Sequence, residues 1–463
     1  MTSPPGEGSL TTRGRHLAGG RGLGPRFRTL YIGTAVSLLG NYVAYLTIPL
    51  LVLQMIGGDA NENATPFSLT YALETLPTLV FGLVGGVILD RVRLRWAMIL
   101  ADVARAAAFF YLATVSGNGG LGADNLPTVY TVAFLVGSFS AVFENALFAI
   151  LPAIVKKEQL AQANGRIAAT QAAMFASGPM LAGAMSALFE SPSPGLWFNG
   201  TTFLFSAVAV FLVGPVGFVH SEEETRSGFV EETLNGLRFL VGERRLRDST
   251  IAAATANLVF GFIESTIVVM ATAVLGATNF QIGVLIVAFG LGSILGAGTA
   301  DRVIRLFGLG RTMTLGLLTM ALGMTLLVFS RFGVPALVFG LVMFIGIGLV
   351  NVPIATIRQV YTPASMLGRV ITASRALSWG TLPIGALLGG MLADQTNYTT
   401  TVRFTPVILF GLAIWLFTTP LWSDTFGPTH RRLRPSSEQD QPGADDDQEP
   451  AGEDEVEGRQ PQG

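Results

Sequence analysis

The sequence predicts an all-α integral membrane protein, with twelve transmembrane helices arranged in two pseudo-symmetric six-helix bundles. Three observations predict this fold: the composition is apolar, the apolar residues fall in runs of membrane-spanning length, and several motifs occur twice. Half of the 463 residues are hydrophobic and only 13% are charged, whereas about a quarter are charged in ordinary soluble domains. Such a chain has too few polar residues to cover a water-soluble surface, so it fits a membrane.

The apolar runs follow one another along most of the chain. A membrane helix needs roughly 20 mostly apolar residues. Runs that meet this requirement cover 29–55, 67–89, 96–116, 128–151, 167–189, 196–219, 250–275, 280–300, 311–330, 334–354, 370–392 and 404–422. The 55 glycines fit membrane helices that pack closely against one another.

The basic residues predict which side of the membrane each loop faces. Of the 29 Lys and Arg residues, only Arg331 and Arg403 fall in loops that follow odd-numbered spans. Cytoplasmic loops carry the excess of basic residues. We therefore expect both termini, and the loops after even-numbered spans, on the cytoplasmic side of a cell (plasma or inner) membrane.

Composition divides the chain into five regions. We expect residues 1–26, rich in Gly and Arg, and residues 423–463, acidic and rich in Pro and Gln, to be disordered cytoplasmic segments. Residues 27–219 and 249–422 are the two six-helix bundles. Residues 220–248 form a cytoplasmic linker, and we expect an amphipathic helix in it, because "FVEETLNGLRFLVGERRLR" has helical spacing.

Repeated motifs indicate that the two halves run in the same direction. Asp301-Arg302-Val303 repeats Asp90-Arg91-Val92 after 211 positions, at the ends of spans 8 and 2. "ANGRI" opens span 5 and "LGRVI" opens span 11, and each is followed by a proline and glycines. Parallel repeats of this kind are typical of transporters.

The aspartate motif "GGVILDRVRLRW" resembles a signature of the major facilitator superfamily, in which a glycine precedes an aspartate and several basic residues. The matching positions are Gly86, Asp90, Arg91 and Arg95 in the first copy, and Asp301 and Arg302 in the second. "NGLRFLVGERRLRD" is similar to the macrolide-efflux-type branch of drug:proton antiporters. The basic residue that drug exporters carry in helix 4 has no counterpart in 128–151.

The resemblance implies a gate at the cytoplasmic ends of the bundles. A carboxylate at such a place meets the positive N-terminal end of a helix in the opposite bundle. Asp90 is then expected to face the start of span 11 near Arg369, and Asp301 the start of span 5 near Arg166. The other interpretation of these charges is the ordinary basic flanking of membrane helices.

The stretch "SGPMLAG" resembles the antiporter motif in helix 5 of drug exporters, through Gly178, Pro179 and Gly183. Two interpretations stay open. The bend at this motif either seals the cavity against leak, or its small residues simply allow tight helix packing.

Charged residues inside the spans are the candidate functional groups, because each costs roughly 3 kcal/mol at mid-helix. Glu264, near the middle of span 7, is the first candidate to carry a coupling proton, with Glu74 or Glu144 as an auxiliary site; no histidine lies in a span. Asp102 and Arg105, one turn apart in span 3, are expected to form a local ion pair.

A central cavity lined by spans 1, 4, 7 and 10 is a further implication of the resemblance. Its expected polar lining consists of Asn41, Asn145, Asn257, Glu264 and Asn351. Asn145 and Asn351 correspond to each other in the two halves.

These features predict a secondary active transporter that exports amphipathic drugs, antibiotics or a secondary metabolite by proton antiport and alternating access. A lysophospholipid or siderophore transporter of the same fold is one alternative, and a sensor or scaffold on a transporter body is another. An enzyme is not expected, because no metal-ligand cluster, nucleophile motif or phosphate loop occurs in or near the spans. We expect a monomer in a lipid bilayer that binds protons and a small amphipathic substrate, without nucleic acid, cofactor or metal.

Overall fold

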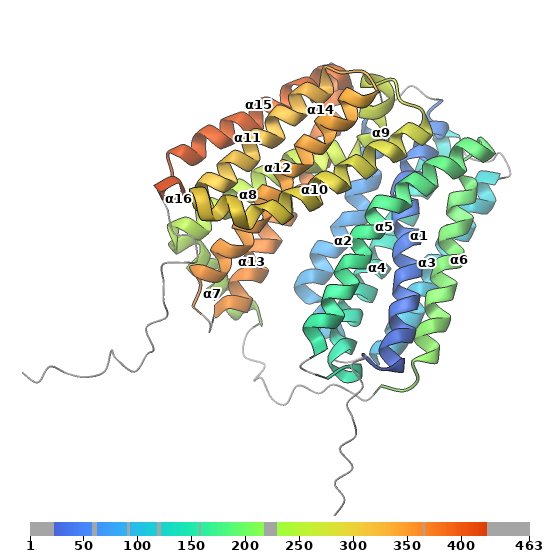
Figure 1. Cartoon of the computed structure of the whole chain (residues 1–463). Coiled ribbons are helices and arrows are strands. Elements are labelled where there is room, and N and C mark those ends of the chain that lie inside the picture. Colours follow the sequence, from blue (N-terminus) through green and yellow to red (C-terminus); the bar gives the residue numbers. More distant parts are fainter. Residues whose placement is uncertain are drawn as a thin grey trace, which may run out of the picture.

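The computed structural model of the chain describes residues 23–57, 63–89, 93–117, 122–156, 159–216, 229–363 and 366–423. Within these ranges the chain forms helices and connecting loops, and no strand (Figure 1). The predicted terminal segments 1–26 and 423–463 lie outside the described residues, apart from 23–26 and Ser423.

The helices follow the order of the predicted spans. The first half contains α1 (Pro25–Met55), α2 (Thr65–Leu89), α3 (Leu94–Gly117), a 3-10 turn (Ala123–Asn125), α4 (Leu126–Ile154), α5 (Leu160–Phe189) and α6 (Ser193–Leu212). The second half contains α7 (Phe229–Gly242), α8 (Arg244–Ser265), α9 (Ile267–Val269), a π-helical turn (Met270–Val274), α10 (Asn279–Phe307), α11 (Leu309–Val328), α12 (Val334–Val360), α13 (Leu367–Trp379), α14 (Thr381–Thr396), α15 (Tyr398–Phe417) and α16 (Pro420–Ser423).

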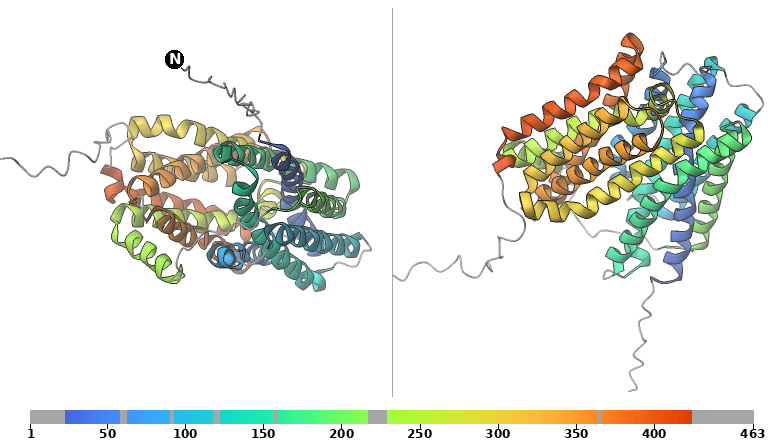
Figure 2. Two further views of the ribbon diagram at one scale, coloured as in Figure 1. Left: turned by 90° about the horizontal axis from the view of Figure 1, so that it is seen from below. Right: turned by 45° about the horizontal axis from the view of Figure 1, so that its top comes forward.

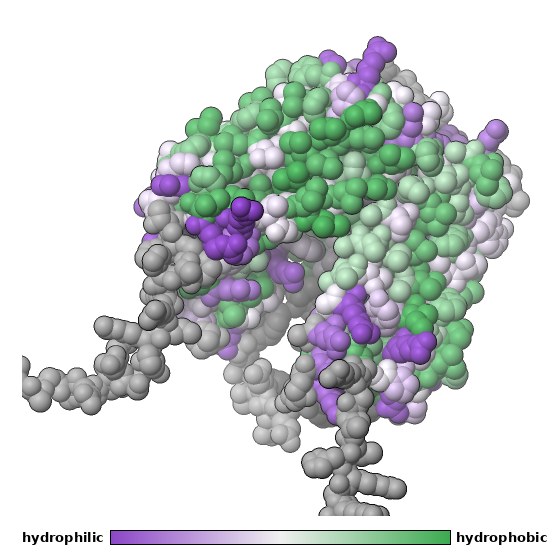
Figure 3. Space-filling view, in the orientation of Figure 1, coloured by the Kyte–Doolittle hydropathy of each residue, from purple (hydrophilic) through white to green (hydrophobic). Residues whose placement is uncertain are grey.

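The all-α membrane fold that the sequence predicts is confirmed. In the part of the chain that the structure describes, ten helices are long and apolar enough to cross a membrane, and the bent pair Arg244–Ser265 and Ile267–Val274 adds an eleventh crossing. α2 corresponds to the remaining predicted span. The helix flanks form a broad apolar surface, whereas hydrophilic residues gather towards the helix ends (Figure 3).

Two of the predicted spans are not continuous helices. Span 250–275 is interrupted at Thr266, where the chain bends by 63°. The Thr266 hydroxyl donates to the Phe262 carbonyl at 2.6 Å, and hydroxyls that bond to their own backbone in this way bend helices. Span 370–392 is interrupted at Gly380, which separates α13 from α14.

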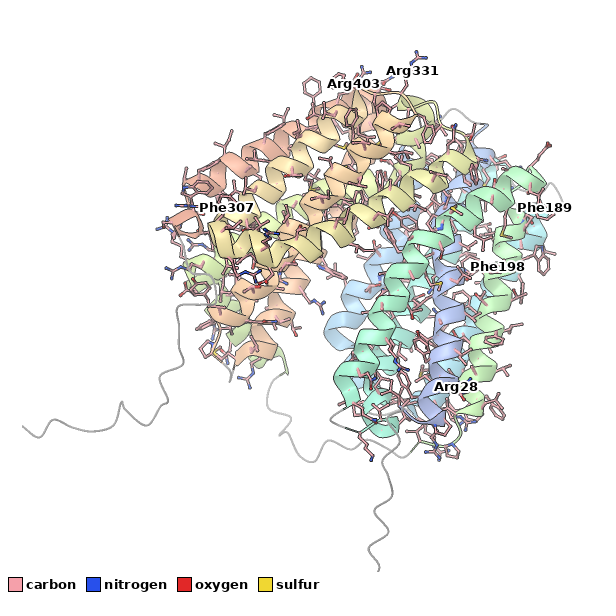
Figure 4. All side chains as sticks on the ribbon, in the orientation of Figure 1. Arg28, Phe189, Phe198, Phe307, Arg331 and Arg403 are labelled. Atoms are coloured by element: carbon pink, nitrogen blue, oxygen red, sulfur yellow. The ribbon has the colours of Figure 1, made fainter. Side chains whose placement is uncertain are left out.

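The helices form two bundles, which lie side by side in both views of Figure 2. α1 to α6 pack together in one bundle, and α8 to α15 in the other. At one end, here called the closed end, α5 packs against α10, and α2 packs against α14. At the opposite end, the open end, the bundles diverge, and the surface is hollowed between them (Figure 3). Arg331 and Arg403 lie at the closed end and Arg28 at the open end (Figure 4).

Glycines bring the helix backbones of the two bundles together near the closed end. A Cβ atom at Gly183 of α5 would lie 2.6 Å from the Asn279 carbonyl oxygen of α10. A Cβ atom at Gly390 of α14 would lie 2.2 Å from the Ser68 hydroxyl oxygen of α2. Small residues allow membrane helices to approach this closely, so the closed end is tightly packed along both contacts.

α7 lies within the predicted linker 220–248 and packs against α13 and α8. Gly236 of α7 faces the backbone of Arg369, because a Cβ atom there would lie 2.8 Å from the Arg369 carbonyl. α8 begins at Arg244. The limits of the five regions stay a prediction.

Candidate functional site

Glu264 lies at the end of a helix, next to the break in the seventh span. Span 250–275, in which Glu264 was expected near the middle, is divided here, because α8 ends at Ser265 and α9 begins at Ile267. The hydroxyls of Ser265 and Thr266 both donate to the Phe262 carbonyl, and these bonds compete with the regular helical pattern. A π-helical turn follows at Met270–Val274. Such turns are frequent at functional sites.

Two tyrosines of the first bundle hold the Glu264 carboxylate. The Tyr71 hydroxyl of α2 donates to Oε2 at 2.5 Å, and the Tyr45 hydroxyl of α1 donates to Oε1 at 3.3 Å. Hydrogen bonds to an ionised acceptor are roughly twice as strong as neutral ones. The acid of one bundle is thus bonded to hydroxyls of the other.

A small cavity lies beside these groups, between α1, α2 and α8. Its volume is about 30 Å³, room for about one or two waters. Its lining is Ala44, Tyr45, Ile48, Pro49, Val52, Phe67, Thr70, Tyr71, Glu74, Glu264 and Ser265. A larger surface depression of about 600 Å³, near Arg331 and Phe339, has no acidic residue in its lining.

The three candidate acids do not form one cluster. Glu74 lines the same cavity as Glu264, so two carboxylates line one small, mainly apolar space. Glu144 is exposed and its charge interacts with Arg105 of α3. This small cavity is lined by the second span through Tyr71 and Glu74, and the fourth span contributes no residue to its lining.

The predicted local ion pair in α3 is present and buried. Arg105 and Asp102 are 1% and 0% exposed, and their side chains are bonded to each other. Arg105 also donates to the Ser140 hydroxyl at 3.3 Å, and its guanidinium lies over the rings of Phe143 and Phe203. Three helices of the first bundle, α3, α4 and α6, thus meet at this pair.

The four asparagines of the expected cavity lining differ in their hydrogen bonds and their exposure. Asn257 donates to the Ser378 carbonyl of α13 at 2.8 Å, within its own bundle. Asn145 donates to the Ala141 carbonyl of its own helix at 2.8 Å. Asn41 is half-buried and Asn351 is exposed. None of these side chains lines the cavity beside Glu264.

The structure describes only some of the predicted gate residues. Asp90 and Arg91 lie outside the described residues, and for Gly86 only the helical backbone is described. Asp301 is paired with Arg305 of its own helix, and Arg302 is exposed beside it. The expected contact of Asp301 with the start of α5 is not made.

The remaining gate residues lie within their own bundles. Arg95 donates to the Phe211 carbonyl of α6 at 2.6 Å, and its guanidinium lies over the Phe211 ring. Arg166, at the start of α5, is exposed. Arg369 lies against Gly236 of α7.

The antiporter-type motif lies where three helices meet. A Cβ atom at Gly178 would lie 2.4 Å from the Tyr42 Cβ of α1. Pro179 faces α10, since a Cβ atom at Gly283 would lie 2.6 Å from its carbonyl oxygen. The motif therefore serves tight packing, and the packing includes a contact between the two bundles.

Tyr45 and Tyr71 are the site residues that sequence reasoning missed. A buried tyrosine hydroxyl usually finds a hydrogen-bond partner. Tyr71 lies one turn before Glu74 in an apolar span. This spacing is the signal in the sequence that could have identified Tyr71. Among the described residues, no group of three His, Cys, Asp or Glu side chains could hold a metal ion.

Comparisons with known proteins identify the family. The model of a family described as "Transmembrane secretion effector" matches residues 24–431. The multidrug efflux pump Tap of Mycobacterium tuberculosis is 27% identical over 406 residues, which are 84% of this chain and 92% of that protein. Macrolide efflux protein A of Streptococcus pyogenes is 24% identical over 384 residues, which are 80% of this chain and 90% of that protein.

A solved structure shares the fold. The bacterial homologue of the human lysosomal transporter Spinster, in an inward-facing and unoccupied conformation, superposes with a TM-score of 0.66 at 13% identity. The match covers 88% of this chain and all of that one. With the family model spanning most of the chain, these findings show that the protein belongs to the transmembrane secretion effector family of the major facilitator superfamily, and that it is a transporter and not an enzyme.

Proposed function

We propose that this transporter exports amphipathic drugs or a secondary metabolite, in exchange for protons, by alternating access. Two relatives, a multidrug efflux pump and a macrolide efflux protein, support the direction and the class of substrate. The substrate class that fits the site best is an amphipathic cation, because two carboxylates and two tyrosines stand among apolar side chains.

The open end faces the cytoplasm in this proposal, so the conformation is inward-facing. The positive-inside rule supports this orientation, since the loops at the closed end carry Arg331 and Arg403 alone of the basic residues. The cleft between the bundles would then admit substrate from the cytoplasm or the inner leaflet. The similarly folded Spinster homologue is inward-facing and unoccupied, which is the conformation proposed for this chain.

Glu264 is the group that we propose to carry the coupling proton. The observation behind this choice is that Glu264 of the second bundle accepts hydrogen bonds from Tyr45 and Tyr71 of the first. Protonation would remove the negative charge that makes these bonds strong. A change in the charge of this one side chain therefore alters the attraction between the bundles, as coupling requires.

Competition for the same carboxylate produces antiport. A cationic substrate pairs with ionised Glu264, and a proton neutralises it, so the two ligands exclude each other. Glu74, across the same cavity, is the auxiliary acid that shares the proton, because two adjacent carboxylates repel each other when both are charged. Glu144, whose charge interacts with that of Arg105, is the second auxiliary candidate.

The test is substrate transport in inverted membrane vesicles, driven by a proton gradient, with Glu264→Gln. We expect the variant to fold and to carry substrate down its own gradient, but to lose uphill transport. Glu190→Gln, at an exposed acid at the end of α5, is the matched control and keeps uphill transport. Full uphill activity in Glu264→Gln would transfer the role to Glu74 or Glu144. Full activity in the triple Gln variant would rule out coupling by these acids.

A further inference from the structure

Asp394 makes a charged contact between the bundles at the closed end. It lies near the end of α14, and its Oδ1 accepts a hydrogen bond from the Ala64 amide at 2.6 Å. The Thr65 amide donates to Oδ1 at 3.2 Å and to Oδ2 at 3.3 Å. Both amides lie at the start of α2, in the opposite bundle.

The contact satisfies groups that α2 cannot satisfy itself. The first amides of a helix have no partner within it, and the helix dipole makes this end positive. Gly390, one turn before Asp394, lets α14 approach Ser68 of α2. The small residue thus sets the distance between the helices, and the carboxylate one turn further on reaches the amides.

The matching contact in the other half is uncharged. Pro179 and Pro383 correspond in the repeat, so Glu190 of α5 takes the place of Asp394. Glu190 is exposed, and the start of α10 is capped by Thr278 and Gln281 of its own chain segment. The α5–α10 contact instead has a hydrogen bond from Asn279 to the Ser186 hydroxyl at 3.1 Å.

We propose that Asp394 is a latch that holds the closed end shut, and that it releases α2 when the transporter opens on this side. The inference rests on the alternating-access cycle proposed above, but not on the choice of coupling acid. The carboxylate reaches the α2 amides only while the bundles touch at this end. It therefore stabilises this conformation relative to one in which α2 and α14 separate.

The experiment measures the distance between the bundles directly. The chain has no cysteine, so Phe189→Cys with Val334→Cys places spin labels at two exposed positions on opposite bundles at the closed end. Electron spin resonance in detergent or nanodiscs gives the distance distribution. In an Asp394→Ala background, we expect the ratio of the longer to the shorter distance to rise by roughly fivefold to thirtyfold.

Three further variants make the result decisive. Asp394→Asn keeps one acceptor oxygen without the charge and should shift the ratio less than Asp394→Ala. Glu190→Ala, at the corresponding position, should leave the distribution unchanged. Gly183→Leu forces a side chain against the Asn279 backbone and should open the closed end, which shows that the labels report opening. A shift with Gly183→Leu but none with Asp394→Ala overturns the latch while the cycle stands. A shift with Glu190→Ala as large as that with Asp394→Ala also overturns it.

Discussion

At the scale of single residues, the Tyr71 hydroxyl is the shortest link between Glu264 and the opposite bundle. Its hydrogen bond measures 2.5 Å, against 3.3 Å for that of Tyr45. The shorter bond is the stronger of the two, because hydrogen-bond strength falls as the distance lengthens. Tyr71 should therefore contribute more than Tyr45 to the attraction between the two bundles that depends on the charge of Glu264.

Tyr71→Phe removes this hydroxyl and keeps the ring in place. A hydrogen bond to a charged group contributes about 1.5–3 kcal/mol, so we expect uphill export to fall by roughly tenfold or more while the protein stays folded. Proton-driven transport in inverted vesicles measures the loss. Tyr130→Phe, at a half-buried tyrosine of α4, should transport like the wild type. Wild-type uphill transport by Tyr71→Phe would show that this bond is not part of coupling.

Glu264 could be singled out from the sequence, whereas its hydrogen-bond partners Tyr45 and Tyr71 could not. A carboxylate in an apolar span costs free energy and therefore stands out. Tyr45 and Tyr71 lie 219 and 193 positions away from Glu264, and a tyrosine in an apolar run is not costly enough to attract notice. Asp394 was not singled out either, because it lies near the end of a helix, where charged residues are common.

At the scale of helices, backbone contact between α8 and α14 determines the shape of the second bundle. A Cβ atom at Gly385 would lie 1.8 Å from the Leu258 carbonyl oxygen, and one at Gly261 would lie 2.1 Å from the Leu382 carbonyl oxygen. The two glycines thus face each other's helices. This contact positions the end of α8, and with it Glu264.

Gly385→Ala should destabilise the protein, because the added methyl group would clash with the backbone of Leu258, which cannot move aside as a flexible side chain can. Overpacking of this kind costs about 1–3 kcal/mol. Gly298→Ala is the matched control, since nothing lies within 4 Å of its Cβ position and alanine favours the helix. Thermal unfolding in detergent, followed by fluorescence, compares them. Equal melting temperatures for the two variants would contradict the packing argument.

The helices themselves were predictable, while their interruptions were not. Apolar runs fix where a membrane helix lies, because the bilayer admits few other backbone structures. The runs extend without a change in hydropathy through Thr266 and Gly380, where the structure ends one helix and begins another. The break at Thr266 depends on a hydroxyl bonding to the backbone and to Tyr398. The contact of Thr266 with Tyr398 forms only in the folded chain, so the hydropathy of the sequence does not reveal it.

At the scale of the whole molecule, the two bundles touch at one end and diverge at the other. The repeated motifs predict the two bundles, but they do not predict which end is closed, because one sequence encodes both conformations of a transporter. In the proposed alternating-access cycle, the expected contact between Asp301 and the start of α5 would form when the open end is shut. In the present conformation Asp301 pairs with Arg305 instead.

The orientation in the membrane follows from the same separation of the two ends. Arg331 and Arg403 lie at the closed end and Arg28 at the open end (Figure 4), and the other basic residues fall in the termini, in loops that follow even-numbered spans, or near those ends of the spans. By the positive-inside rule, the open end should face the cytoplasm. Because the chain lacks cysteine, Arg331→Cys and Arg28→Cys each introduce a single reactive thiol.

A membrane-impermeant maleimide should label Arg331→Cys in intact cells. It should label Arg28→Cys only after the membrane is permeabilised, since that thiol would lie inside. The cysteine-free parent is the background control, and labelling of both variants in permeabilised cells shows that both thiols are accessible. Labelling of Arg28→Cys in intact cells, with Arg331→Cys protected, would invert the orientation. The open cleft would then face outward, and the proposed entry of substrate from the cytoplasm would be wrong.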